Sequence, residues 1–296
     1  FYFVADWHAL TSDYADTSGI VDSAYQMVAD WIAGGLDPER STLFVQSLVP
    51  QHAELYLLLS MTVPIPWLER VPTYKEQMDQ LSEKDLSTHG FLGYPLLQTA
   101  DVIIYNAHYV PVGEDQVAHL ELSREIVRRY HNFFGELFIE PQPLLTKFAR
   151  LPGIDNRKMS KSYGNAVNIA DDEETIRKKV MQMYTDPKRV RADVPGTVEG
   201  NPVFIYHDLF NPDTAEVEDL KDRYRRGAVG DVEVKKKLAR ALNGFLEPIR
   251  QRRSELEARE GLVEEVLHAG NQRYRAVAAE TMRVVHEAMG LTYFRS

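Results

Sequence analysis

Apolar residues along the first half of the chain fall into short runs separated by longer amphipathic stretches. A short apolar run bounded by polar or turn residues is typical of a buried strand, whereas apolar positions that recur every three to four residues are typical of a helix. On that basis we expect strands at residues 1–6, 42–46 and 102–105, and helices at 20–32, 52–61 and 115–133. Strands that alternate with helices of this length predict a parallel, doubly wound α/β sheet.

The pattern changes after Ser162, and from residue 171 to about residue 288 the periodicity is helical almost throughout. We therefore expect two domains. A Rossmann-type α/β domain would occupy residues 1–164, and an all-α domain would occupy residues 165–296. The last helix is expected to pack back on the first domain.

Polar side chains follow the ends of the predicted strands. Asp6 and His8 come after the first strand, and Gln46 ends the second. Ligands of open α/β sheets bind outside the carboxyl ends of the strands, so these side chains are candidates for a binding site. A structural hydrogen bond is the simpler interpretation of His8 alone. Asp115, at the start of the long helix, can act as an N-cap or belong to the same site.

The segment Lys158-Met159-Ser160-Lys161-Ser162 is the most specific motif in the chain. It lies between Pro152-Gly153 and Gly164-Asn165, which indicates a loop. Two lysines three residues apart, with hydroxyl groups beside them, can surround a polyphosphate and stabilise the charge that builds on a pyrophosphate leaving group. A solvated basic turn is the alternative interpretation.

Composition narrows the classes of function. The 296 residues include no cysteine, which excludes disulfides, thiolate zinc sites and cysteine nucleophiles. The formal net charge of −10 argues against indiscriminate coating of nucleic acid but allows one RNA to bind through a local basic face. No apolar stretch is long enough to predict a membrane span. Short basic clusters occur in the helical half, at residues 188–191, 223–226, 235–237 and 250–253.

These motifs resemble a known family. The lysine motif is identical to the second signature of class I aminoacyl-tRNA synthetases, and the surrounding sequence resembles the bacterial tryptophanyl enzymes of that class. Similar segments run along nearly the whole chain, the most specific being Gly93-Tyr94-Pro95, Ala100-Asp101, Tyr105-Asn106, Val110 to Gln116 and His119 to Arg124. The resemblance implies that ATP activates L-tryptophan, that pyrophosphate leaves, and that tryptophan is then transferred to tRNA(Trp).

The resemblance also implies a tryptophan pocket. Asp101 would accept a hydrogen bond from the indole N–H, a group that phenylalanine lacks, and would therefore determine specificity. Tyr94 and Gln116 would hold the amino group of the substrate. At Gln98 the chain departs from the family pattern, in which methionine is common, so a structural role and a substrate contact are both open. The other pocket candidates are Val110 and Val112, as apolar walls, and His8.

For the ATP substrate the resemblance implies contacts on two sides. Gly113, Glu114 and Asp115 would lie at the ribose, and the backbone near Leu151 and Met159 would lie beside adenine. Lys158 and Lys161, the expected catalytic residues, would hold the phosphates, with Ser160 and Ser162 in the same loop. Mg²⁺ is expected on the phosphates, and the sequence contains no carboxylate cluster that suggests a dedicated metal site.

The first signature of the family, a histidine-x-glycine-histidine turn, is absent from the sequence, and His89-Gly90 has no strand before it. Because Phe1 lies inside a predicted strand, we expect that signature on a segment that precedes it. The resemblance further implies an anticodon-binding role for the helical domain, a homodimer and a cytoplasmic location. Tyrosine specificity and a non-catalytic tRNA-binding protein remain as alternatives.

Overall fold

The computed structural model describes residues 1–80, 83–145, 151–159, 164–189 and 191–293. The chain divides into two units, and each is described by itself. Unit 1 consists of Phe1–Val28, Leu36–Ala149 and Glu260–Ser296, and unit 2 consists of Ala29–Gly35 and Arg150–Arg259. The sequence therefore leaves unit 1 and later returns to it.

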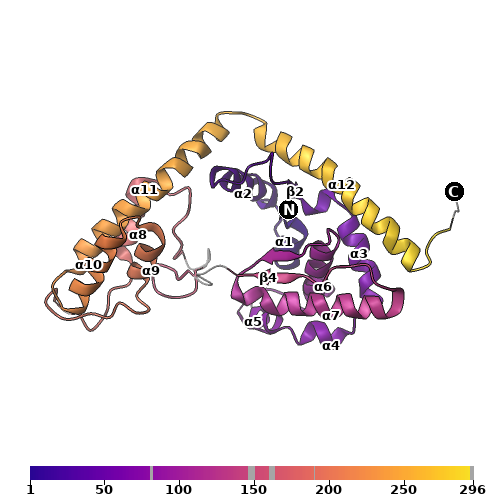
Figure 1. The fold of residues 1–296 in the computed structure, drawn as a ribbon, viewed down its shortest axis with the longest axis horizontal. Coiled ribbons are helices and arrows are strands. Elements are labelled where there is room, and N and C mark those ends of the chain that lie inside the picture. The colour runs from indigo at the N-terminus through magenta and orange to yellow at the C-terminus, as the bar shows by residue number, and fades with distance from the viewer. Residues whose placement is uncertain (81–82, 146–150, 160–163, 190, 294–296) are drawn as a thin grey trace. The chain divides into compact units, whose positions relative to one another are not determined.

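Unit 1 combines short strands with helices (Figure 1). Its described strands are β1 (Tyr2–Val4), β2 (Leu43–Val45), β3 (Tyr109–Pro111) and β4 (Gln142–Leu144). Its described helices are α1 (Asp6–Asp13), α2 (Ile20–Ala33, whose last residues belong to unit 2), α3 (Gln51–Ser60), α4 (Ile65–Glu69), α5 (Pro72–Gln80), α6 (His89–Ile103), α7 (Val117–Phe134) and α12 (Leu262–Ala288), with two short 3-10 helices, η1 (Gln46–Leu48) and η2 (Glu114–Gln116).

The described strands form two parallel pairs. β1 pairs with β2 in a register that places Phe3 opposite Phe44, and β3 pairs with β4 in a register that places Val110 opposite Pro143. Helices connect the strands within each pair, because parallel neighbours need a long crossover. The α/β class predicted for the first part of the chain is confirmed, as is the helical character of the part that follows.

One predicted strand is instead part of a helix. Residues 102–105 were expected to be extended, but they include the end of α6 and the residues directly after it. Ile103 and Ile104 are completely buried, and they share a helical face with the buried Leu96 and Ala100. The apolar run therefore belongs to the buried face of a helix, and a short run of this kind does not distinguish the two structures. The next strand, β3, begins several residues later.

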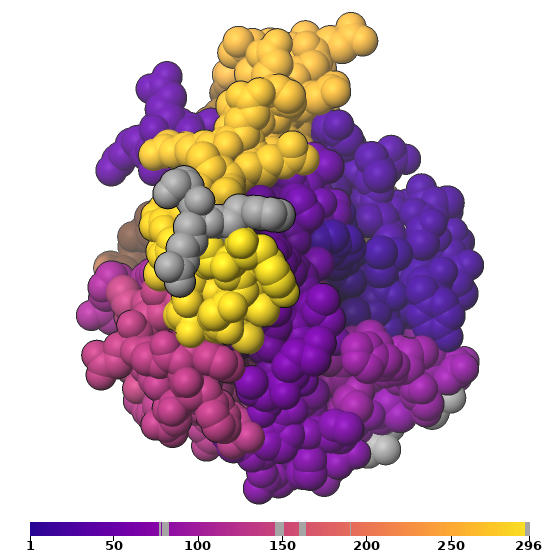
Figure 2. Space-filling model, turned by 90° about the vertical axis from the view of Figure 1, so that its right-hand side faces the viewer, coloured from indigo at the N-terminus to yellow at the C-terminus, as the bar shows by residue number. Residues whose placement is uncertain are grey.

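The core of unit 1 lies between β2 and the helices α3, α6, α7 and α12. The rings of Phe44 and Tyr274 stack in it with centroids 4.6 Å apart and an interplanar angle of 20°. Figure 2 shows the yellow C-terminal part of α12 lying against the purple residues of α3. Helix α12, which comes last in the sequence, therefore forms part of the first core.

Close packing of α12 on β2 depends on one glycine. A Cβ atom at Gly270 would collide with the backbone carbonyl of Leu43, so the helix can approach the strand this closely only without a side chain there. The next residue, Asn271, accepts a hydrogen bond from the Val45 N–H at 3.1 Å. These contacts fix the position of α12 along the strand.

Unit 2 is helical in its described residues. Its complete helices are α8 (Glu173–Gln182), α9 (Pro202–Phe210), α10 (Thr214–Arg225) and α11 (Asp231–Glu257). Three of them begin with a side chain that accepts a hydrogen bond from the first turn, namely Asp172, Asn201 and Asp213. The core of unit 2 includes Ile176 and Val180 of α8 and Leu238 and Leu242 of α11.

Across the described part of the chain, no helix has both the length and the apolar character needed to cross a membrane.

Candidate active site

Asp101 lies on α6, with its carboxylate enclosed inside unit 1 and only 2% of the residue exposed. Its oxygens accept hydrogen bonds from His8 Nε2 at 2.8 Å, from His52 Nδ1 at 2.6 Å and from Gln46 Nε2 at 2.8 and 2.9 Å. Burial alone would raise the pKa of Asp101, but the hydrogen bonds from His52 and His8 outweigh burial and hold the pKa below its usual range. The carboxylate is therefore an anion at neutral pH.

The ends of two strands bring His8 and Gln46 to this carboxylate. Because β1 and β2 are parallel neighbours, their carboxyl ends meet at one edge, where α1 carries His8 and η1 carries Gln46. Asp6 joins the two segments, because its carboxylate accepts hydrogen bonds from the backbone N–H groups of Trp7 at 3.1 Å and Ser47 at 3.0 Å. The expectation that polar residues gather at this edge is confirmed for His8 and Gln46.

Two further side chains complete the cluster around Asp101. Tyr105 belongs to one of the segments on which the family resemblance rests, whereas His52 was not among the sequence candidates. His52 of α3 is completely buried, and its Nε2 lies 2.6 Å from the hydroxyl of Tyr105. Burial, together with the nearby Asp101 charge, raises the pKa of Tyr105, so its hydroxyl keeps its proton and can donate to His52. A histidine inside a helix belongs to no local motif, which is why the sequence did not single it out.

Gln46 has an unusual arrangement of hydrogen bonds. One amide nitrogen donates to both oxygens of Asp101, while its own oxygen, Oε1, is buried without a hydrogen-bond partner among the described residues. A buried acceptor without a donor costs stability, and such groups often have a role in binding. The Asp101 cluster therefore contains a fully used carboxylate and, beside it, an amide oxygen with no partner among the described residues.

A second cluster forms around Tyr94, which lies two helical turns before Asp101 on α6. The Tyr94 hydroxyl lies 3.1 Å from Thr73 Oγ1 of α5 and 3.4 Å from His119 Nε2 of α7. Thr73 and His119 also form a short hydrogen bond with each other. Burial lowers the pKa of His119 to about 4, so its ring is neutral at physiological pH. Burial also raises the pKa of the Tyr94 hydroxyl.

Gln98 connects this second cluster to the start of α7. Its side-chain oxygen lies 2.6 Å from His119 Nδ1, and its nitrogen donates to Gln116 Oε1 at 3.3 Å. Gln116 in turn donates to the carboxylate of Asp115 at 3.1 Å. The interpretation of Asp115 as an N-cap is wrong, because Asp115 lies within η2 and α7 has no side-chain cap. Tyr94 and three other sequence candidates thus lie in one hydrogen-bonded chain.

The remaining candidates of unit 1 lie on or just after β3. Val110 is half-buried within the strand, and Val112 extends the pairing by donating its N–H to the Leu144 carbonyl at 3.2 Å. Gly113 follows in extended conformation, and the exposed Glu114 begins η2. This segment therefore connects the second strand pair to the residues around Gln116.

Lys158 and Met159 lie in unit 2, on a hairpin in which Lys158 pairs with Pro152 as an antiparallel bridge. Asn165 supports this hairpin, because its amide nitrogen donates to the Lys158 carbonyl at 3.0 Å and to Asp155 Oδ1 at 2.8 Å. The hydrogen bond from Asn165 is the main reason why the pKa of Asp155 falls to about 2. The Lys158 side chain is exposed.

The other candidates of the lysine motif divide into two groups. Leu151 and Met159 are half-buried and pack against the core of unit 2. Ser160, Lys161 and Ser162 lie outside the described residues. The structure therefore places the anchored base of the motif but not its second lysine.

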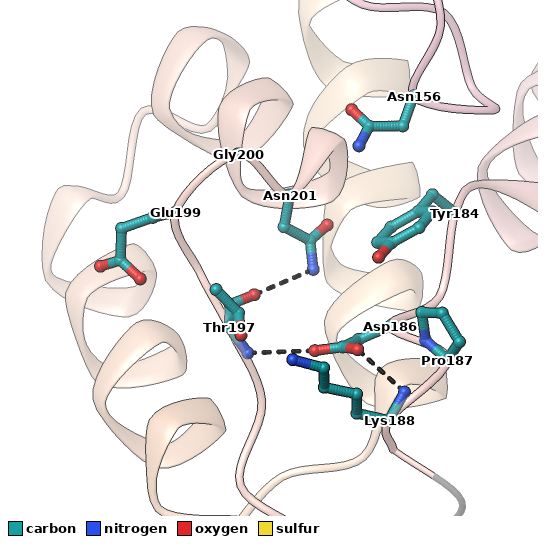
Figure 3. A pocket seen from close by; sticks show the side chains of 9 residues that line it. All are labelled: Asn156, Tyr184, Asp186, Pro187, Lys188, Thr197, Glu199, Gly200 and Asn201. Carbon is teal, nitrogen blue, oxygen red and sulfur yellow. Dashed lines mark hydrogen bonds between the residues drawn. The ribbon is translucent and has the colours of Figure 1, made fainter.

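Unit 2 contains a polar pocket beside this hairpin, with a volume of about 270 Å³ (Figure 3). Asn156 of the hairpin turn and Tyr184 form part of its wall. Asp186 lies on another side and accepts hydrogen bonds from the backbone N–H groups of Lys188 at 3.0 Å and Thr197 at 3.3 Å. Apart from Lys188, which belongs to the basic cluster at residues 188–191, none of the residues that line this pocket was a candidate from the sequence.

Comparison with known proteins gives one consistent family. The model of the family described as tRNA synthetases class I (W and Y) matches residues 1–247. The tryptophan–tRNA ligase of Treponema pallidum (strain Nichols) is 49% identical over 295 residues, which is 99% of this chain and 87% of that protein. The tryptophan–tRNA ligase of Thermotoga maritima is 46% identical over 293 residues, with coverage of 99% and 89%.

Solved structures agree with these sequence relatives. The tryptophanyl-tRNA synthetase of Campylobacter jejuni, crystallised with ADP and tryptophan, superposes with a TM-score of 0.83 at 32% identity. The alignment covers 98% of this chain and 89% of that structure. The similarity therefore includes both units of the fold.

Proposed function

The chain belongs to the class I tRNA synthetases of the tryptophan and tyrosine family, and from this premise we propose that it activates tryptophan with ATP and transfers it to tRNA(Trp). The observation that carries this proposal is the near-full-length similarity to tryptophan–tRNA ligases of several bacteria. Those relatives act on tryptophan, which favours tryptophan over tyrosine as the substrate. The enzyme is thus an aminoacyl-tRNA ligase.

Asp101 is the proposed partner of the indole N–H. Its carboxylate already accepts four contacts, about as many as two carboxylate oxygens can accept, so an indole must replace one of them. The doubled contact from Gln46 is the one that can be given up, because Gln46 keeps a bond to the other oxygen. An arriving indole would then meet an ionised acceptor, which phenylalanine cannot use. His8 completes the pocket as one of the side chains that donate to Asp101.

Tyr94 and Gln116 are the proposed partners of the substrate's amino group. Both are linked through Gln98, and Tyr94 shares α6 with Asp101, so one helix would position the two ends of the amino acid. Val110 and Val112 would supply the apolar walls. The carboxylate of the bound tryptophan would then attack the α-phosphorus of ATP in line, with pyrophosphate as the leaving group.

We propose that Lys158 and Lys161 bind the phosphates of ATP. Ser160 and Ser162 would donate hydrogen bonds from neutral hydroxyl groups to the same phosphates. Positive charge stabilises a pyrophosphate leaving group most when its position is fixed beforehand, and the hydrogen bonds of Asn165 fix the backbone of Lys158. The backbone at Leu151 and Met159 would contact adenine, and residues Gly113, Glu114 and Asp115 would contact the ribose. Mg²⁺ would arrive bound to the phosphates of ATP.

The balance of acidic and basic residues in each unit supports different roles for the two units. Unit 2 contains slightly more lysine and arginine than aspartate and glutamate, whereas unit 1 contains twice as many acidic as basic residues. The phosphates of an RNA favour contact with the less acidic surface. We therefore propose unit 1 as the catalytic unit and unit 2 as the unit that binds the anticodon region of tRNA(Trp). The cytoplasm, where tRNA is charged, is the proposed location.

An exposed apolar patch supports a homodimer. Leu57, Met61, Ile65 and Phe133 of unit 1 are each more than half exposed. Arg129 links this area, because its guanidinium lies over the ring of Phe133 at 5.1 Å and its Nε donates to the backbone carbonyl next to Met61. Contiguous apolar surface on a soluble protein often marks an interface. We propose that this patch, defined by the four apolar residues, contacts a second copy of the chain.

The proposed reaction is tested by tryptophan-dependent exchange of pyrophosphate into ATP, measured with the full-length protein. We expect exchange with tryptophan and very little with tyrosine or phenylalanine. In Asp101→Asn the kcat/KM for tryptophan should fall about tenfold or more, since a hydrogen bond to a charged group is lost, while the KM for ATP stays the same. Asp22→Asn, at an exposed position of α2, is the matched control. Exchange with tyrosine but not tryptophan would refute the proposal.

A further inference from the structure

The hydrogen-bonded chain from Asp115 to Tyr94 has a fixed direction. An ionised carboxylate can only accept, so Gln116 must offer its amide nitrogen to Asp115. The amide oxygen of Gln116 then faces Gln98, which must donate its own nitrogen. The side-chain oxygen of Gln98 then faces His119. Because that oxygen can only accept, Nδ1 of His119 carries a proton and donates it to Gln98. Each orientation follows from the one before.

The same reasoning continues beyond His119. Because burial keeps its ring neutral and Nδ1 carries the proton, His119 Nε2 can only accept. Thr73 therefore donates its hydroxyl proton to Nε2, and the oxygen of Thr73 is left to accept from the Tyr94 hydroxyl. The proton of Tyr94 is thus directed towards Thr73. Tyr94 Oη and Gln116 Oε1 each keep a lone pair that no hydrogen bond among the described residues uses.

An ammonium group has three donors and no acceptor, so it binds best where a site presents only lone pairs. We propose that Gln98 is a positioning residue that carries the orientation of Gln116 on to Tyr94, so that both side chains present acceptors to the substrate's ammonium group. This inference rests on the proposed function of Tyr94 and Gln116. A methionine at this position could not donate to Gln116, so the connection between Gln116 and His119 depends on the amide of Gln98.

The charged and titratable groups around His119 are consistent with this arrangement. The nearby Asp115 favours the protonated form of His119. Burial and the nearby His8 disfavour that form, and burial is the largest of the three effects. Protonation would turn Nε2 into a donor, which would reverse its hydrogen bond with Thr73 and, through Thr73, the hydrogen bond between Thr73 and Tyr94. With a pKa of about 4, His119 keeps the acceptor arrangement throughout the physiological range.

The test compares two ligands that differ in the ammonium group. L-Tryptophan and indole-3-propionate share the ring and the carboxylate, and only tryptophan has the amine. In Gln98→Met, calorimetric titration should show tryptophan binding weakened about tenfold, while indole-3-propionate binding is unchanged. Leu97→Met, on the same helix and outside the chain of hydrogen bonds, should leave the affinity for both ligands unchanged.

Substitutions of Thr73, another member of the hydrogen-bonded chain, test the proposal independently. Thr73→Val keeps the size of the side chain but removes the hydroxyl between His119 and Tyr94, so it should selectively weaken tryptophan binding as Gln98→Met does. Thr73→Ser keeps the hydroxyl and should restore most of the affinity. In steady-state kinetics the KM for tryptophan should rise in the two defective variants while the KM for ATP remains unchanged.

Two outcomes would overturn the role of Gln98. Equal weakening of both ligands in Gln98→Met would mean that Gln98 supports the fold or the ring site, and unchanged tryptophan binding would mean that it has no effect on the ammonium group. Equal binding of both ligands by the unaltered protein is a different failure. It would refute the amino-group contacts proposed for Tyr94 and Gln116, and with them this role for Gln98.

Discussion

Single residues of the site differ in how readily the sequence reveals them. His8 and Gln46 follow from the rule that ligands bind at strand ends, because β1 and β2 are parallel and adjacent. Asp101 required the family resemblance, since a lone aspartate within a helix carries no signal of its own. His52 and Thr73 could not be predicted, because their partners are far away in the sequence and only the packing of helices brings them together.

The buried His119 gives a pH dependence of stability. A histidine of the unfolded chain titrates near pH 6.5, whereas burial lowers the pKa of His119 to about 4. Between those values the unfolded chain binds more protons, so the stability contributed by neutral His119 is complete above about pH 6.5 and is lost as the pH falls through this window. From about pH 7 to about pH 5 we expect a loss of about 2 kcal/mol, measured by urea unfolding.

His119→Gln is the control for this prediction. A glutamine can donate to Gln98 and accept from Thr73 without titrating, so the variant should lose this part of the pH dependence. Identical slopes of stability against pH in the two proteins would show that His119 titrates normally.

Elements are predicted well where the pattern is long and poorly where it is short. Helices α3 and α7 begin and end close to the expected residues, because their apolar positions repeat over several turns. The run at residues 102–105 is predicted to be a strand, but it contains the end of α6 and the residues directly after it. Four apolar residues are compatible with a buried strand and with the buried face of a helix. Helix α11 continues through Pro248, although proline lacks the backbone N–H that a helix interior normally uses. Packing decides such cases, and packing is not visible in the sequence.

The contact of α12 with β2 leads to a prediction about two glycines. Gly270→Ala should lower the free energy of unfolding by about 2 kcal/mol, because the added Cβ collides with the Leu43 carbonyl and the helix must move. Gly244→Ala on α11 is the matched control, since a Cβ there meets nothing within 4 Å. It should raise stability by up to about 1 kcal/mol through helix propensity. Urea unfolding measures both, and a stabilising Gly270→Ala would disprove the close contact.

At the scale of the whole molecule, the sequence indicates an α/β part followed by a helical part, and the structure shows how the chain divides. Residues 29–35 belong to unit 2, and residues 260–296 return to unit 1. Helical periodicity continues through α11 and α12 alike, so nothing in the pattern marks the change from one unit to the other. The assignment of α12 depends on Gly270 and Tyr274, whose partners are early in the chain.

The apolar patch of unit 1 leads to a prediction about assembly. Ile65→Glu should convert a dimer into a monomer at micromolar concentration, because a carboxylate would lose its hydration in the interface. Sedimentation velocity measures the change in mass. Val232→Glu, at a similarly exposed position of unit 2, should leave the dimer intact. A monomeric unaltered protein would refute the proposed interface.

The return of α12 to unit 1 also matters while the protein is being synthesised. A ribosome releases the segments of unit 1 that contain β1 and β2 before unit 2, but it releases the helix that packs on β2 only after all of unit 2. During that interval Leu43 and Phe44 are not yet buried by α12. An exposed apolar strand promotes aggregation. Unit 2 is contiguous apart from residues 29–35 and can fold first. Premature termination before α12 would therefore yield a chain that needs chaperones rather than a shortened enzyme.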